Sequence, residues 1–518
     1  MSPLASPWLG RALALAAGVA AALAQPPFGI LPGLLAFALI LVLVDRADGA
    51  RPLRSAFLRG WLAGVGYFLV SLFWLTEPFQ VNAVQQGWMA PFAVGLVTAG
   101  MALFWGAATL AYRVLAPKGV ARVLVFAGVF AAVEWLRGHI LTGFPWDLPG
   151  EAWKAGSPIS QAASLAGAYG LTWLTLVIAS APAVIPEGRK GPAVVAGAAG
   201  LLAVLFAYGA VRLGRAPAMA PNAPLLRIVQ ADVRQESKYD PDTFSGIVQR
   251  YVTLTAVPAA RPPDIVVWPE GAIPQAMEDY LAPGAWPRDA IVKSLKPGQT
   301  LILGGYRVAN ANVDPPVVYN SLAAFRRQGD ELTPIGLYDK FRLVPFGEFL
   351  PFDALAGRLG IKTFVHVGDG FAAGPRPKPL RLPGLPPVQP LICYEALYPG
   401  FTREGASAAG FRPDWIVNIS NDAWFGATSG PWQHLNIASY RAIEEGLPMV
   451  RATPTGVSAV IDAFGRPLAS LPEGALGVID RPLPPALGPT PFSRFGDAPF
   501  AVMVAVSLAF GRWRRERT

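Results

Sequence analysis

The chain has 518 residues, of which 53% are hydrophobic and only 15% are charged, whereas soluble domains carry about 25% charged residues. This composition excludes a mostly disordered chain and argues against a purely soluble protein. The single cysteine excludes an internal disulfide framework and a metal site with several cysteine ligands. The net charge of +9 leaves nucleic acid and anionic lipid open as partners.

Eight apolar stretches predict an α-helical membrane domain. A bilayer needs about 20 apolar residues per helix, with a range of about 17–25, and most of the stretches meet this length. We therefore predict a polytopic α-helical membrane bundle of about eight transmembrane helices, with seven in an N-terminal membrane domain at 1–213 and one at 490–518. The stretches are 12–24, 30–44, 61–76, 88–112, 123–141, 165–185, 192–211 and 498–510.

The basic residues predict which side of the membrane each loop occupies. With the N-terminus in the cytoplasm, the predicted inside loops and the C-terminal tail follow the positive-inside rule. The outside loops between helices hold only Arg137 and Lys154, although Arg212 and Arg215 run against the rule. The charge is therefore a topology signal that places the segment between the last two helices outside the cytoplasm, and we expect no nucleic-acid partner. The inside residues are Arg46, Arg51, Arg54, Arg59, Arg113, Lys118, Arg122, Arg189, Lys190, Arg512, Arg514, Arg515 and Arg517.

The N-terminus has a second interpretation. Arg11, the apolar run after it and Ala22-Leu23-Ala24 before Gln25 also fit a cleavable signal peptide. The charge rule does not separate the two, because the second helix begins outside in either case. We favour a retained helix, since six further apolar stretches follow it before residue 213.

One predicted membrane helix carries a pair of ionisable residues. Glu134 and Arg137 are three residues apart, which puts them on one helix face. We expect a self-neutralising pair near the outer end of the helix; the alternative is a contact with a lipid headgroup or with the soluble domain. The scarcity of other charges in the helices argues against a transporter, whose spans usually contain paired ionisable residues.

The segment at about 221–485 reads as a soluble α/β domain. Charged residues return, and runs typical of strands alternate with helical patterns. Several of the strands are continuously apolar, as expected for sheets that are covered on both faces. We predict strands at 225–230, 265–268, 300–306, 318–325, 388–393 and 415–420, and helices at 244–254 and 431–445.

Three of these strand ends carry residues able to perform chemistry. Glu270, Lys340 and Cys393 each follow or end a strand-like run, and Cys393 is the only cysteine. Singly, they read as a turn residue, a surface lysine and a small buried side chain. Together, a carboxylate that activates a thiol and an ammonium that stabilises an oxyanion would make an acyl-transfer site. Spacing alone does not show that the three residues meet.

Three motifs in this order resemble the nitrilase, or carbon–nitrogen hydrolase, superfamily. They are Trp268-Pro269-Glu270, the run from Lys340 to Glu348, and Cys393-Tyr394-Glu395. Seven helices before this domain and one after it extend the resemblance over nearly the whole chain, to the apolipoprotein N-acyltransferase family. The segments at 134–138, 143–146 and 418–426 agree with it.

The resemblance implies a fold and a role for each residue. The domain at 221–485 would be an αββα sandwich in which Glu270 is the general base, Cys393 the nucleophile that forms a thioester, and Lys340 the oxyanion stabiliser. Glu348 and Glu395 would support this triad, and Tyr394 would shape the acyl pocket. Tyr239 stands where the family has tryptophan, so a tryptophan-specific role at that position is in doubt. We expect no catalytic role for His434 and an Asx turn at Asn421-Asp422.

The resemblance also implies the reaction and its place. A fatty acyl chain would pass from a membrane phospholipid, through a Cys393 thioester, to the α-amine of an S-diacylglyceryl cysteine at the N-terminus of a lipoprotein. The enzyme would be a monomer without cofactor or metal in the bacterial inner membrane, with its catalytic domain on the periplasmic side. The alternatives are a membrane-anchored amidohydrolase with the same triad, which transfers the acyl group to water, and a lipid-binding or transport protein.

Overall fold

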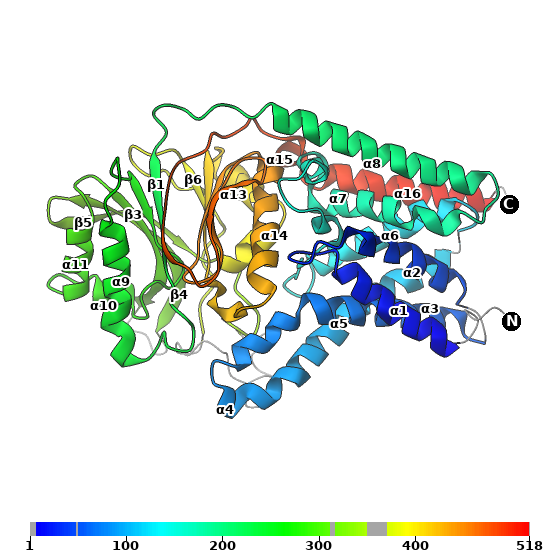
Figure 1. Cartoon of the computed structure of the whole chain (residues 1–518), viewed down its shortest axis with the longest axis horizontal. Helices are drawn as coiled ribbons and strands as arrows, with labels where there is room; N and C mark the ends of the chain where they lie inside the picture. Colours follow the sequence, from blue (N-terminus) through cyan, green and yellow to red (C-terminus); the bar gives the residue numbers. More distant parts are fainter. Residues whose placement is uncertain (1–6, 48–49, 116, 311–315, 350–369, 517–518) are drawn as a thin grey trace. The chain divides into compact units, whose positions relative to one another are not determined.

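The computed structural model describes residues 7–47, 50–115, 117–310, 316–349 and 370–516 (Figure 1). The chain forms two compact units. The first comprises residues 1–216, 428–444 and 489–518, and the second comprises residues 217–427 and 445–488. Arg517 of the predicted basic tail lies outside the described residues, as do the side chains of Arg512, Arg514 and Arg515.

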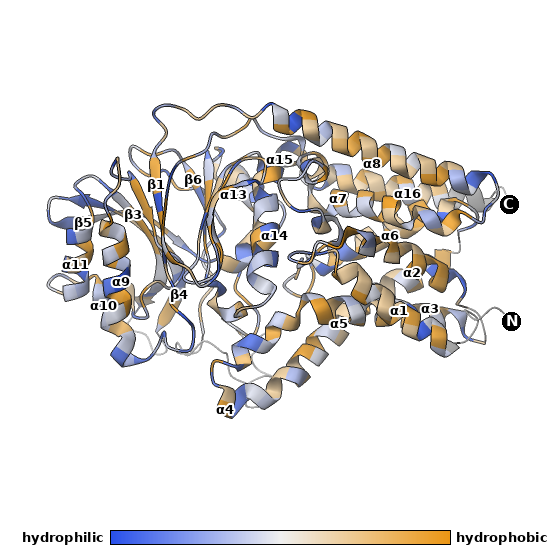
Figure 2. Cartoon of the chain, viewed as in Figure 1, coloured by the Kyte–Doolittle hydropathy of each residue, from blue (hydrophilic) through white to orange (hydrophobic). Residues whose placement is uncertain are grey.

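The first unit is built from helices, most of them apolar over most of their length (Figure 2). Each of the eight predicted apolar stretches overlaps a helix, although the stretch at 123–141 contains Glu134 and Arg137 and runs past the helix end at Arg137. The helices are α1 (Pro7–Ala22), α2 (Ala36–Asp45), α3 (Pro52–Ser71), α4 (Ala83–Gln86), α5 (Ala90–Leu115), α6 (Ala121–Arg137), α7 (Ala163–Ser180), α8 (Lys190–Gly214), α14 (Gly430–Glu445), α15 (Pro491–Phe495) and α16 (Ala498–Glu516).

Three of the helical segments are long and apolar enough to cross a membrane, and a fourth candidate is a bent pair. The three are Ala83–Leu115, Ile159–Val184 and Lys190–Gly214, and the pair joins Pro52–Ser71 to Phe73–Phe79 at 53°. Trp8–Ala22, Leu31–Asp45 and Ala498–Gly511 are apolar but shorter. Among the described residues, length and composition thus support three or four spans, and the prediction of about eight stays a prediction.

Small residues let the helices of this unit approach closely. A Cβ on Gly18 of α1 would lie 1.8 Å from the Ala63 carbonyl oxygen of α3, and one on Gly60 of α3 would lie 1.9 Å from the Thr109 hydroxyl of α5. Such contacts between backbones replace the hydrophobic driving force that lipid does not provide. Helix α14 belongs mostly to this unit, where Tyr440 and Ile443 join an apolar cluster with α7 and α8.

The second unit contains two mixed β-sheets. The first has the order β11-β1-β2-β3-β4-β5 and the second the order β10-β9-β8-β7-β6. Strands β1, β2 and β3 are parallel, as are β6, β7 and β8, and the remaining strands pair antiparallel. The strands are β1 (Leu225–Ala231), β2 (Ile265–Val267), β3 (Thr300–Asn310), β4 (Val317–Gln328), β5 (Glu331–Asp339), β6 (Val388–Ile392), β7 (Trp415–Ile419), β8 (Met449–Ala452), β9 (Ser458–Ile461), β10 (Pro467–Leu471) and β11 (Leu476–Pro482).

Alternation along each strand builds two apolar cores. Leu226 and Ile228 of β1 face the second sheet, where they join Trp415 and Val417 of β7 in a core of buried side chains. Val229 and its neighbours on the opposite face pack against α9 (Phe244–Ala256) and α11 (Trp286–Ser294). On the second sheet, α13 (Phe401–Ala409) lies so close to β6 that a Cβ on Gly405 would come within 2.6 Å of the Gln389 side chain. The predicted sandwich of sheets between helices is confirmed for this unit.

Candidate active site

The three predicted catalytic residues follow the ends of three strands of the second unit. Glu270 lies three residues after β2, Lys340 comes directly after β5, and Cys393 comes directly after β6. Lys340 Nζ lies 3.2 Å from Glu270 Oε1. The charges of both residues act on the Cys393 thiol. The fold therefore brings together three side chains that the sequence could only place at separate strand ends.

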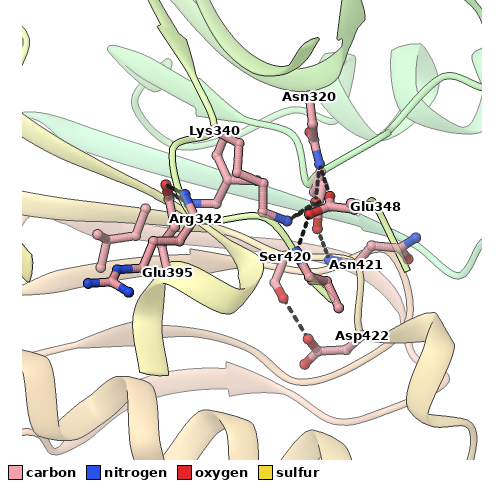
Figure 3. A network of polar contacts seen from close by, with 12 residues as sticks. Asn320, Lys340, Arg342, Glu348, Glu395, Ser420, Asn421 and Asp422 are labelled. Atoms are coloured by element: carbon pink, nitrogen blue, oxygen red, sulfur yellow. Dashed lines mark hydrogen bonds and ion pairs between the residues drawn. The ribbon is translucent and has the colours of Figure 1, made fainter. Parts of the chain in front are cut away.

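A second carboxylate and an amide complete the environment of Lys340. Lys340 Nζ donates to Glu348 Oε1 at 2.8 Å, and the Asn320 amide of β4 donates to Glu348 Oε1 at 2.8 Å and to Glu270 Oε1 at 2.6 Å. Figure 3 shows the ammonium and this amide directed at the Glu348 carboxylate. All four side chains are buried. Asn320 was missed in the sequence because an asparagine inside a predicted strand carries no signal of its own.

Cys393 occupies a tight turn rather than the end of the strand. Strand β6 stops at Ile392, and Cys393 begins a 3₁₀ turn that runs to Leu397. The backbone φ of Cys393 is +48°, a left-handed value that costs a residue with a Cβ on the order of 1–3 kcal/mol. Such a sharp strand-to-helix turn presents a nucleophile away from its own backbone. The predicted strand at 388–393 is thus one residue too long, at the position that matters chemically.

Glu395 connects the cysteine turn to the lysine loop. Its Oε2 accepts from the Ile392 amide at 2.8 Å, and its Oε1 accepts from the Tyr338 hydroxyl at 2.7 Å and from the Phe341 amide at 2.8 Å. Burial raises the pKa of Glu395 to about 7, while these donors act in the opposite direction. Glu395 therefore positions the backbone on both sides of the site, and no hydrogen bond between its side chain and that of Lys340 is found among the described residues.

The segment after β7 contacts the second carboxylate oxygen of Glu270. The Asn421 amide donates to Glu270 Oε2 at 2.7 Å, and Asp422 pairs with Arg451 at 2.6 Å. Asp422 also accepts from the Ser420 hydroxyl at 2.7 Å (Figure 3). The expected Asx turn is not formed by Asn421, because its side-chain carbonyl oxygen accepts no hydrogen bond among the described residues. Asn421 instead joins the environment of the base through its backbone.

The electrostatics of the site keep the thiol protonated and the lysine charged. Burial raises the pKa of Cys393, the Glu270 carboxylate raises it further, and Lys340 offsets only part of this. For Lys340, burial works against the charge, but Glu270 and Glu348 outweigh it and raise the pKa above its ordinary value. A thiol in this state would need a base in order to act as a nucleophile, and the raised pKa of Lys340 favours its charged form.

We expect alkylation of Cys393 by iodoacetamide to show this raised pKa. Because only the thiolate reacts, the rate should still rise with pH between pH 9 and 10, where an ordinary thiol of pKa about 8.5 has levelled off. The measurement is the alkylation rate of the intact protein by mass spectrometry, with a small free thiol as the control. The pH profile does not depend on how accessible the thiol is, and a plateau below pH 9 would contradict the electrostatics.

The other predicted residues lie at different distances from this centre. Tyr394, buried beside Cys393, packs against Tyr398 with ring centroids 5.4 Å apart. Tyr239 exposes 57% of its surface. His434 belongs to the first unit, where its ring lies 5.6 Å from that of Trp146.

Glu134 and Arg137 on α6 of the first unit pair with each other, as predicted. Arg137 forms a buried ion pair with Glu134, and its guanidinium also donates to the Phe144 and Trp146 carbonyls at 2.6 and 3.0 Å. The indole of Trp105 donates to the other oxygen of Glu134 at 2.8 Å. These bonds tie the aromatic segment at 143–146 to the end of α6, which accounts for both residues without a lipid headgroup.

Comparison with known proteins identifies two family domains in the chain. Residues 17–181 match the apolipoprotein N-acyltransferase N-terminal domain, and residues 225–489 match the carbon-nitrogen hydrolase family. An apolipoprotein N-acyltransferase from Caulobacter vibrioides is 56% identical over 505 residues, covering 97% of this chain and 94% of its own. One from Bradyrhizobium diazoefficiens is 38% identical over 523 residues, which cover 98% of this chain and 95% of the relative.

Among solved structures, a nitrilase-superfamily amidase from Nesterenkonia AN1 is similar to part of this chain. The match covers 52% of this chain and 94% of the amidase, with 17% sequence identity and a TM-score of 0.34.

Proposed function

Because the chain belongs to the apolipoprotein N-acyltransferase family, we propose that Glu270, Lys340 and Cys393 carry out its reaction by a ping-pong route. The acyl donor is a membrane phospholipid, and the acceptor is the N-terminal S-diacylglyceryl cysteine of a lipoprotein. The observation that carries this assignment is the buried contact of Lys340 with Glu270, at 3.2 Å, next to a cysteine on a strained turn. No metal or cofactor takes part in the proposed route.

In the first half-reaction, the thiol attacks an ester carbonyl of the phospholipid. Glu270 accepts the proton of Cys393 as the sulfur–carbon bond forms, and the carbonyl oxygen becomes an oxyanion. The Lys340 ammonium stabilises this negative charge in a site from which water is largely excluded. The carbon–oxygen bond of the ester then breaks, Glu270 returns the proton to the departing alkoxide, and a lysophospholipid leaves behind a Cys393 thioester.

In the second half-reaction, the α-amine of the acceptor cysteine attacks the thioester. Glu270 accepts a proton from the attacking amine, and Lys340 again stabilises the oxyanion. The carbon–sulfur bond then breaks to release the amide, and Glu270 passes its proton to the leaving Cys393 sulfur, which restores the thiol. Glu348 and Asn320 hold Lys340 and Glu270 in place through the bonds described above. Glu395 positions the two loops, while Tyr394 and Tyr239 contribute to the surfaces that contact the acyl chain or the substrates.

Contacts within the first unit support eight crossings with the basic loops on one side. Arg122, at the start of α6, pairs with Asp45 at 2.6 Å and with Glu187 at 2.8 Å, and Asp45 also accepts from the Tyr112 hydroxyl at 2.7 Å. The ends of α2, α5 and α7 and the start of α6 therefore share one end of the bundle, as alternate crossing requires. This end adjoins the basic loops, so we assign it to the cytoplasm of the inner membrane.

The end of α8 and the start of α16 belong to the opposite end of the same bundle, where the chain leaves the helical unit and later returns to it. The Trp135 indole near the end of α6 donates to Asp497, directly before α16, at 2.7 Å. Arg212 at the end of α8 donates to Gln161, shortly before α7, which gives this exception to the charge rule a partner. Residues 217–488 connect α8 to α16, so we place the catalytic unit on the periplasmic side.

The test is the fate of the acyl group. Purified protein incubated with phospholipid should retain one acyl chain on Cys393, and addition of a synthetic diacylglyceryl-cysteine peptide should transfer that chain to the peptide amine. The same peptide with an acetylated amine is the matched control and should accept nothing. Release of free fatty acid at the same rate without acceptor would favour the amidohydrolase alternative, and intact masses of protein and peptide distinguish the outcomes.

A further inference from the structure

Lys238 is a buried cation beside the active site that the proposed mechanism does not use. It follows β1, whose parallel neighbour β2 leads to Glu270, so both residues lie beyond the same sheet edge. The side chain is only 2% exposed. Its ammonium has no hydrogen bond or ion pair with any described residue, and the ring centroid of Tyr239 lies 5.9 Å away.

The backbone next to the catalytic base leaves room for this ammonium. Gly271 follows Glu270 with a φ of +56°, and a Cβ at this position would lie 2.7 Å from Lys238 Nζ. Any larger residue would therefore be strained and would displace the ammonium. Burial lowers the pKa of Lys238 to about 8, although the Glu270 carboxylate acts in the opposite direction.

A second unused polar atom belongs to Asn421, whose backbone amide donates to Glu270. The Asn421 side chain donates to Gln235 Oε1 at 3.0 Å, but its own carbonyl oxygen is buried and has no partner among the described residues. Gln235 belongs to the same turn as Lys238. An unpartnered buried polar atom such as the Asn421 carbonyl oxygen is costly. Together with the nearby Lys238 ammonium, which has no ion pair among the described residues, it indicates that this edge accommodates a polar ligand.

The positive charge of Lys238 indicates that the ligand of this edge is an anion. An unpaired buried ammonium is complemented by an anion. Glu270 and Glu348 already place two carboxylates against one ammonium, that of Lys340, so a further anion would be repelled without Lys238. Of the two substrates in the proposed function, the donor carries an anionic phosphodiester, whereas the acceptor presents an amine that Lys238 would repel.

We propose that Lys238 binds the phosphodiester of the donor phospholipid and so holds its ester bond at Cys393. This inference rests on the proposed function and adds a donor-binding residue to it. Because the contact is present before and during attack, it contributes to binding rather than to the chemical step. The acceptor, which has no phosphate, does not use this site.

The experiment measures thioester formation by the full-length protein as a function of the mole fraction of phosphatidylethanolamine in mixed micelles. In Lys238→Met, the half-saturating mole fraction should rise by about 10-fold or more, as expected for loss of a bond to a charged group. The rate at saturation should stay within about 2-fold of wild type. Lys293→Met, which removes an exposed lysine of α11 in the same unit, is the matched control and should change neither value.

Each other result overturns the proposal. A fall in the saturating rate, or a lowered thermal unfolding midpoint without a change in half-saturation, would make Lys238 catalytic or structural. Competition by inorganic phosphate that disappears in Lys238→Met, with phospholipid half-saturation unchanged, would assign the site to free phosphate. An acyl adduct that persists in Cys393→Ala would instead refute the proposed function, so failures of the two proposals are distinguishable.

Discussion

Replacing Cys393 with alanine is expected to abolish acyl transfer and to leave the fold intact. Incubation of wild type with phospholipid should add the mass of one acyl chain, and Cys393→Ala should add none. The rate should fall by at least about 10⁴-fold, because the variant lacks the group that we propose forms the covalent intermediate. Intact-mass spectrometry after exposure to phospholipid alone makes the measurement.

The structure predicts that this substitution has little effect on stability. Cys393 is only partly buried, and alanine keeps the same backbone and Cβ in the turn that begins at φ +48°. The urea midpoint of Cys393→Ala should therefore match that of wild type closely, which separates loss of chemistry from loss of fold. An acyl adduct of undiminished amount in the alanine variant would show that another residue is the nucleophile.

Replacing Lys340 with methionine should damage both activity and stability. The substitution removes the proposed oxyanion stabiliser, which is expected to slow thioester formation by about 10²–10³-fold. It also leaves Glu270 and Glu348 facing each other without the ammonium that lies 3.2 and 2.8 Å from them. Breaking a buried ion pair from one side costs about 3–5 kcal/mol in the free energy of unfolding.

A double variant separates the two effects. In Lys340→Met/Glu348→Gln, one carboxylate charge disappears together with the ammonium, so Glu270 no longer faces a second negative group. The free energy of unfolding should recover a large part of what the single variant loses, while thioester formation should stay about 10²-fold or more below wild type. If the double variant regained activity along with stability, Lys340 would have a structural role only. Chemical denaturation and single-turnover kinetics on the same preparations give the two readouts.

Long apolar strands and helices were predictable because their patterning is local. The predicted runs at 225–230, 265–268 and 300–306 correspond to β1, β2 and β3, and the predicted helix at 244–254 corresponds to α9. Strands β8 and β9, with four residues each, were not predicted because a few residues carry too little pattern. The proposed count of eight spans rests on the charge of the loops as much as on helix length.

The sequence by itself determined the class of fold, the presence of apolar helices around one α/β domain, and the identities of Glu270, Lys340 and Cys393 as candidates. These follow from composition, periodicity and motifs, all of which are read along the chain. Only the tertiary structure decided how the candidates are held. Asn320 and the Asn421 amide reach Glu270 across 50 and 151 residues. Glu395 bridges two loops, and Lys238 forms no hydrogen bond or ion pair with the residues that the structure describes. Hydrogen bonding between side chains and buried charge depends on which strand ends meet in space, and chain order does not specify this.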